Sequence, residues 1–155
     1  MINLKTILVP IDFSLSSQTA LDYAAAFGAD FGAQIHLLCV VEEESLSANI
    51  GGDPLNTRES WRKENLKKLE EFIPEKYKDL DLIKRVEGGL TYEAILKYAQ
   101  ENSIDLIIMG ANGQTGFIES WLGGTTYEVA RKAPCAVLTV KPEGSAIDLK
   151  AFGLD

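Results

Sequence analysis

The sequence predicts an α/β fold: a single doubly wound, Rossmann-like domain whose five parallel strands lie in the order 3-2-1-4-5. Short apolar runs alternate with amphipathic segments along the chain, which is the pattern of successive βαβ units with right-handed crossovers. The length of 155 residues suits one domain, and no internal repeat or linker divides it. We therefore expect one domain over residues 1–141, followed by a tail over residues 142–155 without a strong pattern.

The N-terminal βαβ unit is predicted from residues 4–41. "LKTILVPID" (4–12) has a continuously apolar centre, typical of a strand that is buried on both faces. Residues 14–33 have a helical pattern, which Ser14 or Ser16 could cap. "QIHLLCVV" (34–41) is the second predicted strand. The residues expected on the buried face of the helix are Ala20, Tyr23, Ala24, Phe27 and Phe31.

An acidic, glycine-containing loop over residues 42–54 leads to the middle of the chain. A helix is expected to start after Pro54 and to end at Pro74, because proline cannot continue a helix. "DLDLIKRVE" (79–87) is a weaker third strand. The predicted apolar stripe of the helix consists of Trp61, Leu66, Leu69 and Phe72 or Ile73.

The C-terminal part contains the most distinct strand, "IDLIIMG" (104–110). A helix over residues 90–102 precedes it, with Thr91 as the expected cap. A short helix over residues 125–132 and a strand "PCAVLTVK" (134–141) follow it. The residues of the 90–102 helix expected to face inward are Ile95, Tyr98 and Ala99.

Composition and charge exclude several function classes. The net charge is −8, and no basic stripe is present, which argues against general nucleic-acid binding. No apolar run is long enough to span a bilayer, so we expect no membrane partner. Cys39 and Cys135 belong to no CxxC or Cys/His set. We expect both to be buried, reduced thiols, which favours a cytoplasmic location.

Glycines cluster in "MGANGQTGFIESWLGGTTYEVA" (109–130), directly after the fourth strand. Ligands of open α/β sheets lie at the carboxyl ends of strands where the strand order reverses. In the predicted order, Asp12 after the first strand faces this glycine loop. Its carboxylate suits ribose hydroxyls or a phosphate-bound Mg²⁺, and the glycine amides and the following helix N-terminus suit phosphate. The simpler alternatives are a ligand-free tight loop and a capping or loop carboxylate at Asp12.

The stretch contains neither a P-loop nor a dinucleotide fingerprint. Its G-x2-G-x9-G spacing, Gly110, Gly113 and Gly123, resembles the nucleotide-binding signature of the universal stress protein family. "ILVPIDFS", "IHLLCVVE" and "LGGTTYEVARKAPCAVLTVK" resemble that family in the same order, so the likeness covers roughly residues 5–141. The resemblance implies a doubly wound domain, dimers, and ATP or AMP binding in one branch, with no nucleotide in another.

The resemblance also implies site residues. Asp12 would lie at the ribose and could contact a phosphate-bound Mg²⁺. Two positions depart from the family pattern: Gly124 stands where Ser or Thr is usual, and Gln114 where Arg or Lys is frequent. We therefore expect phosphate binding that is weak or favours fewer phosphates. The implied nucleotide-binding residues are Pro10, Ile11, Asp12, Val40, Met109, Gly110, Gly113, Gln114, Gly123, Gly124, Thr125 and Thr126.

No catalytic residues are predicted. His36 is the only histidine and lies early in a strand, so a structural role is expected and a Ser-His-Asp arrangement is not. Trp61 and Trp121 are expected to be packing residues. The acidic run at residues 42–44 is expected to be a solvated loop, with a lid over the nucleotide as the alternative. Any enzymatic activity would be limited to slow ATP hydrolysis or self-phosphorylation.

The favoured function is therefore a cytoplasmic stress-response protein that binds ATP or AMP and acts as a nucleotide-sensing dimer. Residues 135–140 would form an edge strand without internal charge or proline, which favours pairing with a second copy. One alternative is a nucleotide-free dimeric adaptor of the same fold. A remote alternative is a phospho-acceptor receiver domain, suggested by Lys141-Pro142, but its acidic cluster is missing.

Overall fold

The computed structural model describes residues 1–42, 54–111, 123–145 and 149–153. The strands are β1 (Thr6–Pro10), β2 (Gln34–Val41), β3 (Leu82–Gly88), β4 (Leu106–Gly110) and β5 (Ala136–Val140). The helices are α1 (Leu15–Phe31), α3 (Pro54–Phe72), α4 (Thr91–Glu101) and α5 (Gly124–Lys132). Two short 3₁₀ helices, η1 (Glu75–Tyr77) and η2 (Leu149–Phe152), complete the described elements.

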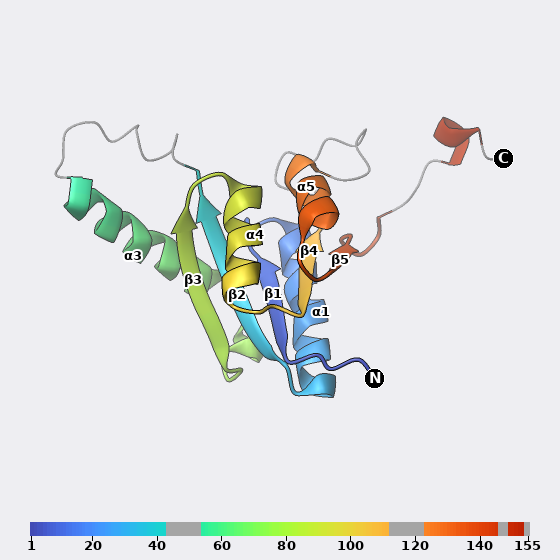
Figure 1. The fold of residues 1–155 in the computed structure, drawn as a ribbon, viewed down its shortest axis with the longest axis horizontal. Helices are drawn as coiled ribbons and strands as arrows, with labels where there is room; N and C mark the ends of the chain where they lie inside the picture. Colours follow the sequence, from blue (N-terminus) through green and yellow to red (C-terminus); the bar gives the residue numbers. More distant parts are fainter. Residues whose placement is uncertain (43–53, 112–122, 146–148, 154–155) are drawn as a thin grey trace.

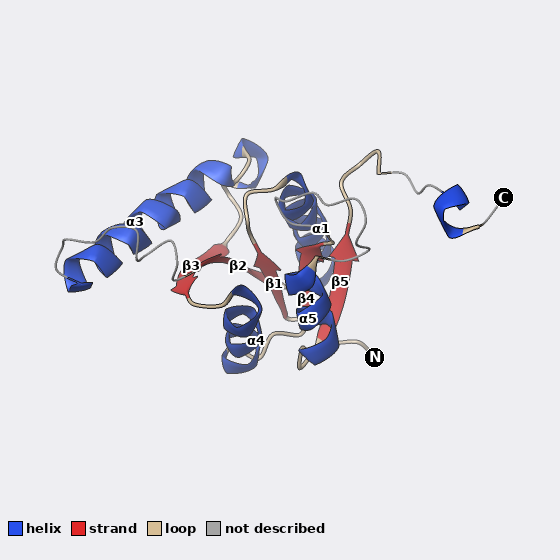
Figure 2. Cartoon of the chain, turned by 90° about the horizontal axis from the view of Figure 1, so that it is seen from above, coloured by secondary structure: helices blue, strands red, loops and turns tan. Residues whose placement is uncertain are grey.

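The strands form one parallel sheet in the order β3-β2-β1-β4-β5, which confirms the predicted fold class and strand order (Figure 1). Helices α1 and α3 cover one face of the sheet, and α4 and α5 cover the other (Figure 2). The strand order reverses between β1 and β4. The chain therefore leads from β1 to α1 on one face of the sheet, and from β4 to α5 on the other face (Figure 2). No described helix is long and apolar enough to cross a membrane.

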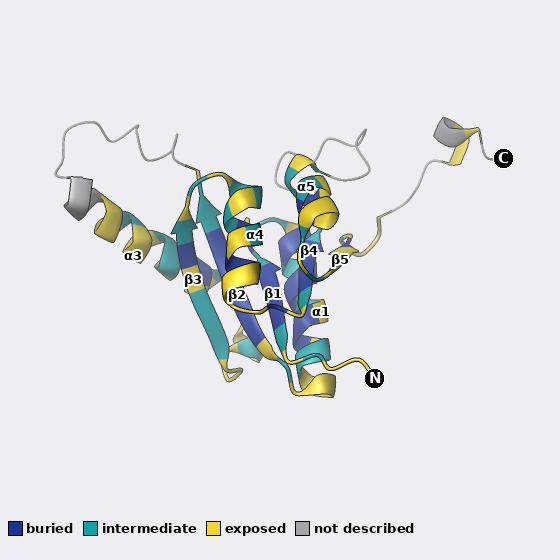
Figure 3. Cartoon of the chain, in the orientation of Figure 1, coloured by how far each residue is buried: buried dark blue, intermediate teal, exposed yellow. Residues whose placement is uncertain are grey.

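Two hydrophobic cores lie on the two faces of the sheet. Strand β1 contributes to both, because successive side chains of a strand point to opposite faces. Ile7 and Val9 pack with α1 and α3, whereas Leu8 packs with α4 and α5, and all three are fully buried (Figure 3). Burial of such side chains contributes about 1.5–3 kcal/mol each. The continuously apolar first strand of the sequence is thus buried on both sides, as predicted.

Helix α1 begins and ends as its sequence favours. The Oγ atom of Ser14 accepts a hydrogen bond from the amide of Ser17 at 3.1 Å, which confirms Ser14 as the cap. Gly32 ends the helix in the left-handed conformation, with φ of 67°. Such a conformation favours glycine because it has no Cβ.

The predicted buried face of α1 was wrong at two positions. Tyr23 and Phe31 are 47% and 55% exposed, whereas Leu21 is fully buried beside Ala20 and Ala24. Residues four apart in a helix are displaced by about 40° around its axis. Tyr23 is thus displaced by about 60° from the direction of Ala20, at the edge of the buried face. Phe31 shares the direction of Ala20 and Ala24 but is the last residue of α1, at the end of the helix.

The other helices largely match their predicted faces. Leu69 and Ile73 are buried in the α3 side of the core, and Trp61, Leu66 and Phe72 are partly buried against it. In α4, Ile95, Tyr98 and Ala99 are buried as predicted.

The predicted cap of α4 was wrong. Leu90 occupies the cap position and no side chain caps the helix, whereas Thr91 is the first helical residue. Its hydroxyl donates to Oε1 of Glu42 at 2.9 Å, away from its own helix. A contact with the end of a neighbouring strand cannot be read from local sequence.

Both cysteines are free thiols, but they differ in burial. Cys39 is buried and Cys135 is only half-buried, so the expectation of two buried thiols was wrong for Cys135. It lies just before the edge strand β5, where only one neighbouring strand covers it.

The chain leaves β5 into residues 142–145, and η2 lies apart from the sheet (Figure 1). The boundary between a domain at residues 1–141 and a tail at residues 142–155 stays a prediction.

Candidate functional site

A cleft of about 660 Å³ opens at the carboxyl edge of the sheet, where β1 and β4 diverge. Every predicted site residue that the structure describes lines this cleft. These residues are Pro10, Ile11, Asp12, Val40, Met109, Gly110, Gly123, Gly124, Thr125 and Thr126. Gly113, Gln114 and Trp121 lie outside the described residues. A second hollow of about 600 Å³ lies between α3 and β3, lined mostly by charged side chains and distant in sequence from the glycine loop.

The β1–α1 connection holds Asp12 at the cleft. Oδ1 of Asp12 accepts hydrogen bonds from the amide of Ser14 at 3.0 Å and from its hydroxyl at 2.5 Å. Phe13, between them, has φ of 66°, a conformation that costs a non-glycine residue on the order of 1–2 kcal/mol. The ring of Phe13 packs edge-on against Phe72 of α3, with centroids 5.5 Å apart. Asp12 is thus a loop carboxylate, as the simpler alternative has it, and also a wall of the cleft.

A backbone hydrogen bond joins the two residues that flank segment 112–122, and a second one ties Ala111 to β5. The amide of Ala111 donates to the carbonyl of Val140, and the amide of Gly123 donates to the carbonyl of Ala111, both at 2.8 Å. Gly123 is then the cap residue of α5, and Gly124 is its first helical residue. The first amides of a helix have no acceptor within it, and the helix dipole makes this end favourable for an anion. The N-terminus of α5 at the cleft is therefore suited to an anion.

The structure requires glycine at position 110 but not at position 124. A Cβ atom on Gly110 would lie 2.4 Å from Cβ of Ser16, so β4 can approach α1 only with glycine at this position. A Cβ atom on Gly124 would meet nothing within 4 Å, and its φ does not require glycine. Packing thus explains Gly110 without any ligand, whereas neither packing nor backbone geometry explains Gly124.

The two threonines of α5 have different surroundings. Thr126 is 4% exposed, and its hydroxyl donates to the carbonyl of Gly110 at 2.9 Å. This bond fastens α5 to the end of β4 and occupies the hydroxyl hydrogen of Thr126. Thr125 is half-buried at the cleft. Thr125 is therefore the better placed hydroxyl of the pair for a ligand.

Sequence reasoning did not place Thr91 at the cleft, and it named Glu42 only as part of an acidic run that could be a solvated loop or a lid. Glu42 and Thr91, joined by their hydrogen bond, both line the cleft. Each follows the end of a strand, so the rule that identified Asp12 could have found them. Asn65 and Cys39 also line it. Asn65 lies in the middle of α3, and its place at the cleft depends on how α3 packs, which no local signal reveals.

The described titratable groups provide no evident catalytic pair. Burial raises the pKa of Cys39 to about 11, so its thiol is protonated at neutral pH and a poor nucleophile. Burial, and next the charge of Arg85, lowers the pKa of His36. Its Nδ1 atom lies 2.9 Å from the hydroxyl of Tyr98 in the core, consistent with the expected structural role. Over the described residues, no three carboxylate, thiol or imidazole groups gather closely enough to hold a metal ion.

Comparison with known proteins gives one consistent result. The model of the universal stress protein family matches residues 3–141. The universal stress protein MJ0577 of Methanocaldococcus jannaschii is 33% identical over 162 aligned residues, which cover 91% of this chain and 97% of that protein. The solved structure of MJ0577 superimposes with a TM-score of 0.77 at 29% identity and covers 93% of this chain and 100% of that one.

Two more distant structures share the fold and contain adenine nucleotides. A universal stress protein in complex with cAMP has a TM-score of 0.65 at 22% identity, covering 92% of this chain and 100% of that one. The protein At3g01520 of Arabidopsis thaliana, with AMP bound, has a TM-score of 0.55 at 15% identity and covers 90% of this chain and 93% of that one.

Proposed function

Because the chain belongs to the universal stress protein family, we propose that its cleft binds an adenine nucleotide and that occupancy of the cleft is a signal in the stress response. The observation that carries the proposal is the convergence of all the described predicted residues on one cleft at the strand-order reversal. The cAMP and AMP complexes of proteins with the same fold support the choice of ligand.

In this proposal the adenine lies against Pro10, Ile11 and Val40, where the ends of β1 and β2 give an apolar surface. The carboxylate of Asp12 accepts hydrogen bonds from the ribose hydroxyls. Met109 and Gly110 form the back of the site.

The phosphate lies at the N-terminus of α5, near Gly123, Gly124 and Thr125. Gly113 and Gln114, which lie outside the described residues, are proposed as further phosphate contacts. The hydrogen bond between Thr126 and Gly110 holds this helix end in place, so Thr126 contributes mainly through its backbone.

Titration calorimetry of the nucleotide-free protein with AMP and with ATP tests the proposal. We expect saturable binding that Asp12→Asn weakens at least tenfold, because an amide replaces an acceptor of two ribose hydrogen bonds and each bond to a charged group contributes about 1.5–3 kcal/mol. Asp30→Asn, on the exposed last turn of α1, is the matched control and should bind as the parent does. If the folded protein shows no heat of binding with any adenine ligand, the proposal is wrong.

A nucleotide-free adaptor is the second candidate function. Gly124 lacks the hydroxyl that is usual at this place in the family, and the hydroxyl of Thr126 already has a partner. Native mass spectrometry of the freshly purified protein separates the two candidates, because a retained mass of ATP, ADP or AMP favours binding. Because the chain belongs to the universal stress protein family, the receiver-domain alternative is excluded.

The ATP form of the ligand would bring Mg²⁺ with its phosphates. Since the described residues offer no group of three metal ligands, Asp12 would be a single additional contact to a phosphate-bound ion. Slow hydrolysis or self-phosphorylation is the most activity that this arrangement supports.

We also propose that two copies pair through β5. This strand is at one edge of the sheet, and Val137 and Leu138 are only half-buried on its two sides. An edge strand without charge or proline favours pairing with a second copy. Light scattering should give the mass of a dimer at micromolar concentration, and Val137→Lys should shift it toward the monomer. Free thiols at Cys39 and Cys135 support a cytoplasmic setting.

A further inference from the structure

The carboxamide of Asn65 interrupts the apolar stripe of α3 at the cleft. Residues four apart in a helix differ in direction by about 40°, so Asn65 shares the sheet-facing side of α3 with Trp61 and Leu69. Leu69 is fully buried and Trp61 is partly buried in the core on this face. Asparagine has a low helix propensity and adds polar atoms that need partners, so packing alone favours an apolar residue here. Asn65 lines the cleft, where a ligand can be such a partner.

Contacts of α3 place Asn65 beside the ends of β1 and β2. Phe72, which points within about 20° of Asn65, packs edge-on against Phe13 in the β1–α1 connection, with ring centroids 5.5 Å apart. One turn after Asn65, Lys68 lies close enough to Cys39 of β2 for its charge to act on the thiol. Cys39 also lines the cleft and is next in sequence to the adenine surface proposed at the end of β2. The carboxamide is therefore on the side of the cleft proposed for the base.

A hydrogen bond fixes which way the carboxamide of Asn65 points. Its Nδ2 atom donates to the carbonyl oxygen of Trp61, one turn earlier, at 3.0 Å. A carbonyl oxygen only accepts hydrogen bonds, so the reversed amide would bring two oxygen atoms together. Oδ1 is therefore the atom that points away from the helix backbone. Over the described residues no donor contacts Oδ1, and it is not one of the polar atoms that are sealed from solvent without a partner.

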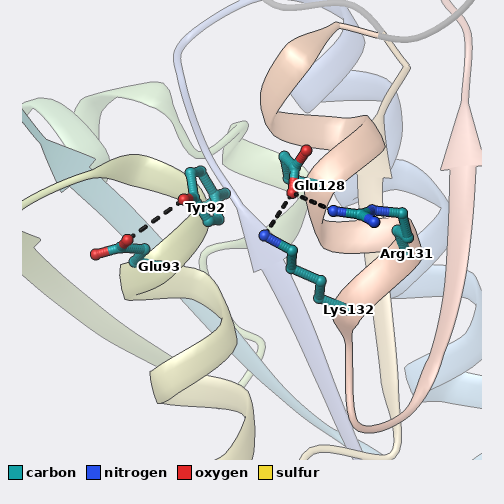
Figure 4. A network of polar contacts seen from close by, with 5 residues as sticks. All are labelled: Tyr92, Glu93, Glu128, Arg131 and Lys132. Atoms are coloured by element: carbon teal, nitrogen blue, oxygen red, sulfur yellow. Dashed lines mark hydrogen bonds and ion pairs between the residues drawn. The ribbon is translucent and has the colours of Figure 1, made fainter.

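Other polar side chains around the cleft are engaged with one another. On the opposite face of the sheet, Glu128 contacts Arg131 and Lys132, at 3.5 and 2.7 Å (Figure 4). Nζ of Lys132 also lies 5.0 Å from the centroid of the Tyr92 ring. None of these four side chains lines the cleft. Among the described residues that do line it, Asn65 has the one carboxamide.

We propose that Asn65 selects the base of the nucleotide: its Oδ1 atom accepts a hydrogen bond from the exocyclic amino group of adenine, so the cleft prefers AMP to IMP. This inference rests on the proposed nucleotide-binding function. Hypoxanthine, the base of IMP, has the shape of adenine but a carbonyl oxygen in place of the amino group. Two acceptors would then face each other with no hydrogen between them. Guanine has the same carbonyl group, so GMP is disfavoured for the same reason.

The expected preference follows from the value of one hydrogen bond. A neutral hydrogen bond corresponds to about twofold to twelvefold in affinity, and a desolvated acceptor left without a partner to about fivefold to 150-fold. Because Asn65 is half-buried, we expect AMP to bind about fivefold to fiftyfold more tightly than IMP. Purine riboside has only a hydrogen atom in place of the amino group. It should bind about twofold to twelvefold more weakly than adenosine.

Titration calorimetry of the full-length protein with AMP and IMP tests the inference. Asn65→Leu removes the acceptor and suits the apolar stripe of α3, so it should lower the ratio of AMP to IMP affinity at least fivefold. Asn65→Asp keeps an acceptor at the same place and should keep the preference for AMP, because its added charge acts equally on the two ligands. Asn102→Leu is the matched control. Nδ2 of Asn102 makes the same bond to the carbonyl of Tyr98, at 2.9 Å, at the end of α4 away from the cleft, and its loss should leave the ratio unchanged.

The inference and the function on which it rests fail in different ways. Equal affinities of AMP and IMP in the parent would overturn the base selection, as would a ratio that Asn65→Leu leaves unchanged. A ratio that falls as far in Asn65→Asp or in Asn102→Leu would overturn it too, because the acceptor would not be its source. If neither AMP nor IMP binds, the nucleotide-binding function itself is wrong, and the base selection with it.

Discussion

Replacing Gly124 by serine should strengthen the binding of phosphate-bearing ligands. The substitution fits the structure, because a Cβ atom at this position meets nothing within 4 Å and no positive φ opposes it. The new hydroxyl would lie in the first turn of α5, beside the amides proposed to hold the phosphate. The parent chain has no side chain at this point.

The expected gain is modest and specific. A neutral hydrogen bond contributes about 0.5–1.5 kcal/mol net, which corresponds to about twofold to twelvefold in affinity for AMP. Adenosine, which has no phosphate, should gain nothing. Serine should also stabilise the fold by a few tenths of a kcal/mol, because glycine loses more backbone entropy in a helix.

Gly124→Ala is the matched control, because it has the same effect on the backbone without the hydroxyl. Calorimetric titration of parent, alanine and serine proteins with AMP and adenosine separates the two contributions. If serine binds AMP no more tightly than alanine, or if adenosine gains as much as AMP, the phosphate does not lie at the N-terminus of α5.

Three further predictions concern the fold around the cleft. Gly110→Ala should lower the free energy of unfolding by about 1–3 kcal/mol in urea denaturation, because its Cβ would overlap Ser16, and an unchanged stability would show that β4 and α1 are not so close. Phe13→Gly should be about 1 kcal/mol more stable than Phe13→Ala, because both lose the contact with Phe72 but only glycine relieves the positive φ; equal stabilities would contradict that backbone conformation. The pKa of His36 is lowered from 6.5 in the folded state, so its stabilising contribution is complete above pH 6.5 and is lost as the pH falls below it, at no more than about 1.4 kcal/mol per pH unit. Urea denaturation between pH 7.5 and 5.5 should show this slope, and His36→Gln should flatten it; the same slope in parent and variant would exclude His36 as its source.

The order of elements was predictable because each local pattern agrees with the global one. The apolar strands, the cap at Ser14 and the prolines around α3 all indicate an alternation of strands and helices. The predicted strand order then places the reversal between β1 and β4. The positions of Asp12 and Gly110 at the cleft followed in turn, since both stand at or just after the end of a strand.

What the sequence could not predict depends on contacts between distant segments. Tyr23 and Phe31 have a helical spacing, yet both are exposed, because Tyr23 lies at the edge of the buried face of α1 and Phe31 is its last residue. Thr91 is a residue type that often caps a helix, but its hydroxyl donates to the side chain of Glu42 instead. The reason for Gly110 is its approach to Ser16, ninety-four positions earlier in the chain, and only the packed structure distinguishes it from Gly124.

The central claim is that an adenine nucleotide occupies the cleft between the ends of β1 and β4. Amide chemical-shift mapping of ¹⁵N-labelled protein titrated with AMP tests it most directly. The account predicts that the largest shifts fall at Ile11, Asp12, Val40, Gly110 and Gly123 to Thr125, with little change along β3. Shifts that concentrate instead around Lys67 to Lys84, in the hollow between α3 and β3, would contradict it.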